Sequence, residues 1–108
     1  MSKNETYRED LIYLLKYRYK IFLNKDSEEG INRHVFYSTQ NTHGNHFYHV
    51  RYVMDKSGKV EHIKDFPVVT VPFGSRDEYM SEVESIVDKI MNFIKVNGYE
   101  VSCNRKER

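Results

Sequence analysis

The sequence predicts a single α+β domain: an N-terminal helix, a three- to four-stranded antiparallel sheet, a long second helix packed on the sheet and a possible short C-terminal strand. Two segments with helical periodicity enclose a region, residues 33–73, that is rich in β-branched and aromatic residues. The 108 residues are enough for one compact domain but not for two. Residues 104–108 are charged, and we expect a frayed tail there.

The first helix is predicted over residues 7–23, followed by a loop over residues 24–30. Arg18 falls within the apolar stripe of this helix, so it is expected to extend to solvent or to pair with a carboxylate such as Asp65 or Glu100. The apolar face of the helix consists of Leu11, Ile12, Leu14, Leu15, Tyr19 and Phe22.

Four stretches of strand-type residues follow, at 33–40, 46–54, 60–65 and 66–73. Residues 55–59 are expected to form a tight turn between the second and third, and Pro67 and Pro72 place the last stretch at an edge or a bend. Alternation divides the second strand into two faces, Tyr48, Val50, Tyr52 and Met54 on one and Phe47, His49, Arg51 and Val53 on the other.

The second helix has the clearest signals at its two ends. Ser75 and Glu78 have the spacing of a capping box, and Gly98 suits the residue that follows a helix C-terminus. Residues 99–103 alternate in polarity and predict a last short strand. The core stripe of the helix is Val83, Ile86, Val87, Ile90 and Ile94, flanked by Tyr79, Met80 and Phe93.

Composition points to a cytoplasmic protein that does not enter membranes. Cys103 is the only cysteine, so no intrachain disulfide can form, and the chain starts without the apolar region of a secretory signal. No apolar run approaches the roughly 18 residues of a membrane span. The chain contains no alanine, although alanine is the best helix former. Such a composition indicates an A/T-rich coding bias, which is typical of small genes of phages and other mobile elements.

An aromatic-basic surface is the first candidate site. Tyr13, Lys16, Tyr17 and Lys20 lie opposite the apolar stripe of the predicted first helix, and His49 and Arg51 are assigned to a binding face of the sheet. Tyrosine gives large, stiff contact area at interfaces, and lysine with tyrosine also suits phosphate contact and base stacking. The alternative is that these long side chains only cover the flanks of the helix.

An acidic surface is the second candidate. Residues 65–104 carry 3 basic and 7 acidic side chains, against 11 and 8 in residues 1–64. A solvated helix face explains this excess, and so does a carboxylate patch that docks on a basic partner. Its members on the second helix are Asp77, Glu78, Glu82, Glu84 and Asp88.

Histidines supply the weakest candidate, a metal site formed by His43, His46 and His49. On one strand, the odd separation of His46 and His49 directs them to opposite faces, which opposes chelation. No nucleophile elbow, zinc-protease motif or phosphate-binding loop is present, so neither a catalytic residue nor a cofactor is predicted.

The order of elements resembles that of the double-stranded RNA-binding domain. That resemblance implies phosphate-binding lysines at the start of the second helix. Here residues 74–78 read Gly-Ser-Arg-Asp-Glu, whose carboxylates repel phosphate, so the family is not assigned.

Together these features predict a non-enzymatic binding protein. Its expected role is that of a phage or mobile-element accessory protein that binds and modulates a host or defence protein, with an anti-CRISPR-like activity as one form. The first alternative is a nucleic-acid-binding module that uses the Tyr/Lys face, although a net charge of +1 is low for that class. The second alternative is a histidine-dependent hydrolase or nuclease.

Overall fold

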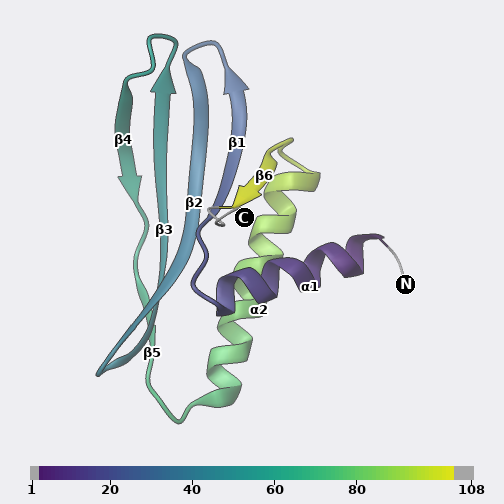
Figure 1. Cartoon of the computed structure of the whole chain (residues 1–108), viewed down its shortest axis with the longest axis vertical. Helices are drawn as coiled ribbons and strands as arrows, with labels where there is room; N and C mark the ends of the chain where they lie inside the picture. The colour runs from purple at the N-terminus through teal and green to yellow at the C-terminus, as the bar shows by residue number, and fades with distance from the viewer. Residues whose placement is uncertain (1–2, 104–108) are drawn as a thin grey trace, which may run out of the picture.

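A computed structural model describes residues 3–103, with side chains from residue 7 to residue 102; the predicted tail lies outside this range. The sheet order is β4-β3-β2-β1-β6, all neighbours are antiparallel, and β5 pairs with β3. Both helices lie on the same side of the sheet (Figure 1). The elements are α1 (Lys3–Lys16), β1 (Ile21–Ser27), β2 (Gly30–Asn41), β3 (Gly44–Asp55), β4 (Val60–Asp65), β5 (Val69–Val71), α2 (Arg76–Lys95) and β6 (Glu100–Cys103).

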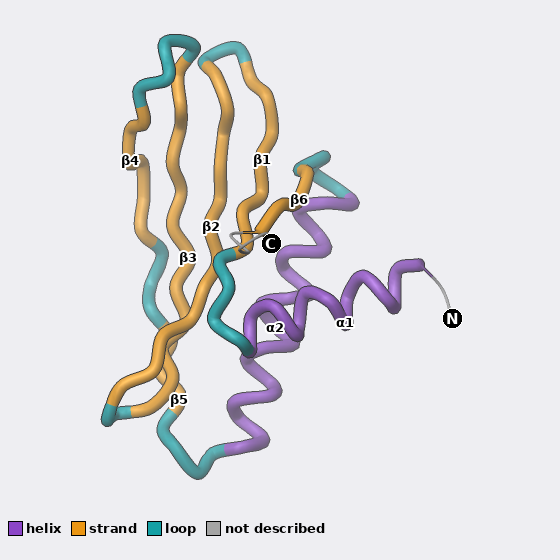
Figure 2. Tube along the Cα trace, in the orientation of Figure 1, coloured by secondary structure: helices purple, strands orange, loops and turns teal. Residues whose placement is uncertain are grey.

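The α+β class, the two helices and the antiparallel sheet are confirmed, but the sheet has more strands than predicted. The prediction of one helix through residue 23 and a loop through residue 30 is wrong, because the chain turns after Lys16 and forms β1 (Figure 2). β1 makes a hairpin with β2, and on its other side it pairs with β6. Within residues 3–103, neither helix combines the length and apolar character of a membrane span.

α1 ends in a backbone arrangement centred on Arg18. The Tyr19 N–H donates to the Leu14 carbonyl over 3.0 Å, and the Arg18 N–H donates to the Leu15 carbonyl over 3.3 Å. This pair of bonds is that of a Schellman motif, whose left-handed position is usually glycine. Arg18 occupies that position with a φ of 68°. The helix therefore stops at a residue that carries no glycine signal in the sequence.

The Arg18 side chain explains why arginine stands there. Its Nη1 donates to Ser38 Oγ over 3.0 Å and its Nη2 donates to Asn45 Oδ1 over 2.8 Å. Ser38 and Asn45 are buried on β2 and β3, and Ser38 Oγ donates to the Leu15 carbonyl. The expected pairing with Asp65 or Glu100 is wrong, because the guanidinium joins the end of α1 to the sheet through uncharged groups.

We expect Arg18→Gly to lower the free energy of unfolding by about 1–2 kcal/mol, because the loss of two partners for buried polar groups outweighs the relief of backbone strain. Arg18→Ala loses the same bonds and keeps the strain, so it should cost about 1 kcal/mol more. Urea denaturation of the three proteins measures this order. An alanine variant as stable as the glycine variant would show that the left-handed backbone contributes nothing.

The core lies between the two helices and one face of the sheet. Ile21 is paired with Phe36, and Phe36 with His49, so these three side chains project toward the helices. The predicted core stripe of α2 is confirmed, although the Ser75 side chain makes no capping bond and only its carbonyl accepts, from the Tyr79 N–H over 2.9 Å. The fully buried members of the core are Leu11, Leu15, Ile21, Leu23, Phe36, Val83, Val87 and Ile90.

Candidate functional site

The sheet face turned away from the helices is the candidate site. Directly paired residues of antiparallel strands project to the same face. The registers join Phe22 to Val35 and Arg33 to Tyr52, and these rows lie on the side that neither helix covers. We call this surface the open face, and the same registers place the carboxylates of Asp26, Asp65 and Glu100 on it. Its apolar, aromatic and cationic residues are Phe22, Ile31, Arg33, Val35, Tyr37, Tyr48, Val50, Tyr52, Met54 and Val60.

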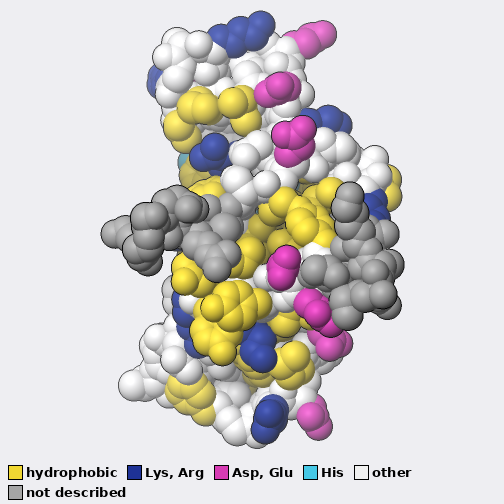
Figure 3. Space-filling view, turned by 45° about the vertical axis from the view of Figure 1, so that its right-hand side comes forward, with side chains coloured by type: hydrophobic (Ala, Val, Ile, Leu, Met, Phe, Trp, Pro, Cys, Tyr) yellow, Lys and Arg dark blue, Asp and Glu magenta, His cyan; other side chains and the backbone are white. Residues whose placement is uncertain are grey.

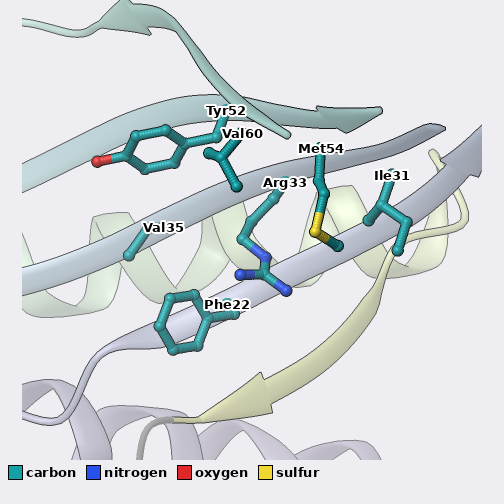
Figure 4. A pocket seen from close by; sticks show the side chains of 7 residues that line it. All are labelled: Phe22, Ile31, Arg33, Val35, Tyr52, Met54 and Val60. Carbon is teal, nitrogen blue, oxygen red and sulfur yellow. The ribbon is translucent and has the colours of Figure 1, made fainter. Parts of the chain in front are cut away.

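A pocket of about 150 Å³ opens on this face (Figure 4). Its walls are apolar or aromatic, and its one charged lining residue is Arg33. A volume this far below the usual 300–1,000 Å³ of a ligand cleft suits a single side chain rather than a free small molecule. We call it the Arg33 pocket; Phe22, Ile31, Arg33, Val35, Tyr52, Met54 and Val60 line it.

The Arg33 guanidinium is held in place by two neighbours on β1. Its Nε donates to Asn24 Oδ1 over 2.7 Å, and its central carbon lies 5.1 Å from the centre of the Phe22 ring. Figure 4 shows the guanidinium beside that ring. A planar guanidinium fixed through Nε presents its remaining N–H groups together, which suits a carboxylate.

Arg33 forms no ion pair with a carboxylate within the described part of the chain. The ion pairs formed there join Arg8 to Asp88, at 3.1 Å, and His62 to Asp65, at 2.8 Å. Asp26 and Glu100 line a neighbouring hollow that Arg33 also borders, but neither forms an ion pair with it. The open face therefore has an apolar centre with a cation that forms no ion pair, beside a hollow that carries two carboxylates.

Two tyrosines stand side by side further along the open face. The ring centres of Tyr37 and Tyr48 lie 4.8 Å apart with an angle of 7° between the rings, and the Lys20 ammonium lies 5.2 Å from the centre of Tyr37. The ring separation equals the usual spacing of neighbouring strands. The two rings are therefore stacked face to face from β2 to β3, with their planes roughly perpendicular to the sheet. Burial raises the pKa of Tyr37, with help from Tyr52, Tyr48 and Asp65, and this keeps its hydroxyl protonated.

The predicted aromatic-basic face is divided between two surfaces. Tyr13 and Tyr17 are exposed on the last turn of α1 and just after it, with ring centres 4.5 Å apart, and Lys16 is exposed beside them. Lys20 lies beyond the helix, over Tyr37 on the open face. The structure does not bring the four residues together, because the helix ends at Lys16.

The two sheet residues predicted to bind, His49 and Arg51, lie on the helix-covered face. Arg51 is half-buried and its Nε donates to Asn32 Oδ1 over 2.9 Å. His49 is buried, and its ring stacks between Phe36 and Phe66 at centre distances of 4.1 and 3.9 Å. Neither side chain lies on the open face.

His49 belongs to a buried histidine pair. Its Nε2 lies 2.8 Å from His34 Nδ1, so the rings share one hydrogen bond, and its Nδ1 has no partner among the described residues. Burial, reinforced by Arg51, lowers the pKa of His34 to about 4. Burial lowers the pKa of His49 to about 3, with contributions from His34, Lys89 and Lys64. Both imidazoles are neutral at pH 7.

The histidines of residues 43–49 are spread over the β2–β3 turn and both sheet faces. His43 is exposed on the turn, and His46 lies on the open side, where its ring nitrogens meet Thr70 Oγ1 at 2.9 Å and Asn41 Oδ1 at 2.8 Å. Among the side chains of residues 7–102, no three His, Cys, Asp or Glu residues gather as metal ligands.

The acidic residues of α2 do not act as one group. Asp77, Glu78 and Glu82 border a groove of about 520 Å³ between α2 and β5, whereas Asp88 is paired with Arg8. Glu84 is exposed on the same helix. Viewed from the helix side, acidic side chains are spread over the length of the molecule, some next to one another and others apart, with apolar and basic side chains among them (Figure 3).

Sequence reasoning missed Phe22, Arg33 and Tyr37 as members of a common surface. Residues 21–27 were predicted to be helix and loop. The prediction therefore contained no strand that could place Phe22 beside Arg33. One signal was available: Ile21, Phe22 and Leu23 form a short apolar run with a β-branched and an aromatic residue, which is typical of a strand.

The fold and the open face define the class of this protein as an α+β domain with one sheet face covered by helices and one uncovered. Comparison with models of protein families, with curated proteins and with solved structures finds no match to this chain.

Proposed function

We propose that this chain is a non-enzymatic binding protein that modulates a partner protein through its open face. The observation that carries the proposal is an uncovered sheet face whose centre is apolar and aromatic and contains one fixed cation, Arg33. Aromatic residues and arginine are enriched at the centres of protein interfaces and supply much of their binding energy.

Geometry favours a protein partner over a nucleic acid. A base stacks on an aromatic ring only where the face of that ring is free. Tyr37 has Lys20 against one side and Tyr48 against the other, so Tyr37 presents its edge and hydroxyl to a partner. The net charge of +1 also provides little of the phosphate attraction that dominates nucleic-acid binding.

We further propose that the partner is a host or defence protein and that the chain acts inside the cell as a phage or mobile-element accessory protein, of which an anti-CRISPR-like inhibitor is one form. Support for this part comes from composition alone, namely from the absence of alanine and the single cysteine.

Capture from a cell lysate with three matched proteins tests the interface. Tyr52→Glu puts a charge on the open face, and Tyr17→Glu makes the same change just after α1, where the side chain is 62% exposed. We expect wild type and Tyr17→Glu to capture the same stoichiometric partner, with or without nuclease, and Tyr52→Glu to lose at least 90% of it. Circular dichroism confirms that both variants are folded.

Two results would overturn the proposal. If Tyr52→Glu still captured the partner, the open face would not be the interface. If Tyr17→Glu lost the partner, the interface would instead include Tyr13 and Tyr17, at the end of α1. Disappearance of the partner after nuclease treatment would make nucleic acid the ligand.

A further inference from the structure

A second cavity, of about 270 Å³, lies between α2 and the residues that join β4 to β5. Its walls are mostly aromatic or aliphatic, and among them are Phe36, Phe47, Phe66 and Ile86. The exposed Pro67 also lines it, so the cavity is open to solvent. We call it the His49 cavity, because His49 is the one imidazole in its lining. Its volume is close to the lower end of the usual range for ligand sites, roughly 300–1,000 Å³.

The imidazole of His49 is fixed at the wall of this cavity. The Phe36 ring covers one of its faces at a centre distance of 4.1 Å and an angle of 19°, and the Phe66 ring covers the other at 3.9 Å and 5°. The Nε2 atom lies 2.8 Å from His34 Nδ1 and shares a hydrogen bond with it. Since both faces and one nitrogen are engaged, the ring cannot rotate without losing these contacts.

The second nitrogen of His49, Nδ1, is buried and has no hydrogen-bond partner among the described residues. His34 packs against Phe93 and Tyr99, at ring-centre distances of 4.5 and 5.3 Å, and none of these three residues lines the cavity. The Nε2 edge of His49 therefore faces away from the cavity, and the opposite edge, which carries Nδ1, faces toward it. A buried polar atom without a partner is costly, so this position calls for a hydrogen-bonding group from outside the chain.

Water alone does not account for this arrangement. At about 30 Å³ per molecule, the cavity has room for about nine waters, whereas one water is enough to pair with Nδ1. The other waters would lie against apolar walls, which favours their displacement by an apolar body. Glu82 and Lys89 line the cavity with opposite charges, so its lining as a whole favours neither anions nor cations.

We propose that the His49 cavity binds a small, uncharged aromatic molecule whose hydroxyl group pairs with His49 Nδ1. A hydroxyl donates to an unprotonated nitrogen and accepts from an N–H, so it satisfies Nδ1 whichever histidine of the pair supplies the shared proton. The ring of the ligand packs against the phenylalanines of the wall. The cavity shares no lining residue with the Arg33 pocket, and this inference does not rest on the proposed function.

Titration of the isotope-labelled full chain with three small molecules, followed by NMR chemical shifts, tests this site. The probe is 4-ethylphenol. In the first control, 1-ethyl-4-fluorobenzene, fluorine replaces the hydroxyl, and in the second, 4-ethylbenzoate, a charged carboxylate replaces it. We expect the probe to bind about five-fold more tightly than either control, because the fluorine analogue loses the hydrogen bond and the carboxylate loses its hydration. The largest shifts should fall on the cavity residues of β3, β5 and α2.

Matched variants identify the groups responsible. His49→Phe keeps an aromatic ring at this position but has no Nδ1, so it should still bind the probe and lose the preference over the fluorine analogue. His34→Leu removes the histidine pair and keeps His49 Nδ1, so the preference should persist. Ile86→Trp fills the cavity and should abolish binding of all three molecules. Ile94→Trp changes a half-buried residue of α2 outside the cavity lining, and binding should be unchanged.

Circular dichroism confirms the folding of each variant. Absence of shifts up to the solubility limit of 4-ethylphenol, or equal binding of the probe and the fluorine analogue to the wild type, would overturn the inference. Tighter binding of 4-ethylbenzoate, or a preference that survives His49→Phe, would do the same. If His49→Phe does not fold, Ile86→Trp and Ile94→Trp still decide the place of the site, because equal binding by these two variants would put the ligand outside the cavity.

Discussion

Replacing Gly44 with alanine is expected to lower the free energy of unfolding by about 3–5 kcal/mol, the largest effect of any single change considered. Gly44 opens β3 with a φ of +134°, a conformation that side chains rarely adopt. A Cβ at this position would overlap the carbonyl oxygen of Val71 and lie 2.9 Å from the Cα of Pro72. Both are backbone atoms, so the clash is relieved only by moving β5 away from β3.

Gly58 offers a matched control for this experiment. It also has a positive φ, +91°, but a Cβ there would meet no atom within 4 Å. Gly58→Ala should therefore cost only the backbone strain, about 1–2 kcal/mol. Urea denaturation of both variants separates the cost of backbone strain from the cost of steric overlap with β5. Equal costs for Gly44→Ala and Gly58→Ala would mean that β5 does not press on Gly44.

Acid is expected to destabilise the fold through the histidine pair, with a loss of about 4 kcal/mol between pH 7 and pH 5. His34 and His49 have folded-state pKa values of about 4 and about 3, below the ordinary value of 6.5. Between pH 6.5 and those values, the unfolded chain binds more protons than the folded chain, so stability falls as pH falls. Each histidine contributes about 1.4 kcal/mol per pH unit in this window.

Chemical denaturation at a series of pH values measures the slope. A second protein, His34→Leu with His49→Phe, removes both titrating groups and retains an aromatic ring between Phe36 and Phe66. Its unfolding free energy should change little between pH 6.5 and 5. A wild-type profile that is flat over this range, or the same slope in the double variant, would contradict a role for the pair.

Sequence patterns predicted an element correctly where its structure depends only on residues close to one another in the chain. The periodicity of α2, the alternation in β3 and the hairpin at residues 55–59 are short-range properties, and the structure has them nearly where they were predicted. The end of α1 was not predictable in this way. Arg18 adopts a left-handed backbone because Ser38 and Asn45, which are distant in sequence, accept its hydrogen bonds.

What the sequence by itself determined is the class of fold, the presence of both helices but not the end of the first, and the division of β3 into two alternating faces. Which of these faces the helices cover was decided only in the tertiary structure. Tyr48, Val50, Tyr52 and Met54 look like the more apolar set, yet they lie on the open face. The helices cover the opposite face because the larger apolar area is summed over several strands, through Ile21, Leu23, Phe36 and Phe47, which only register brings together.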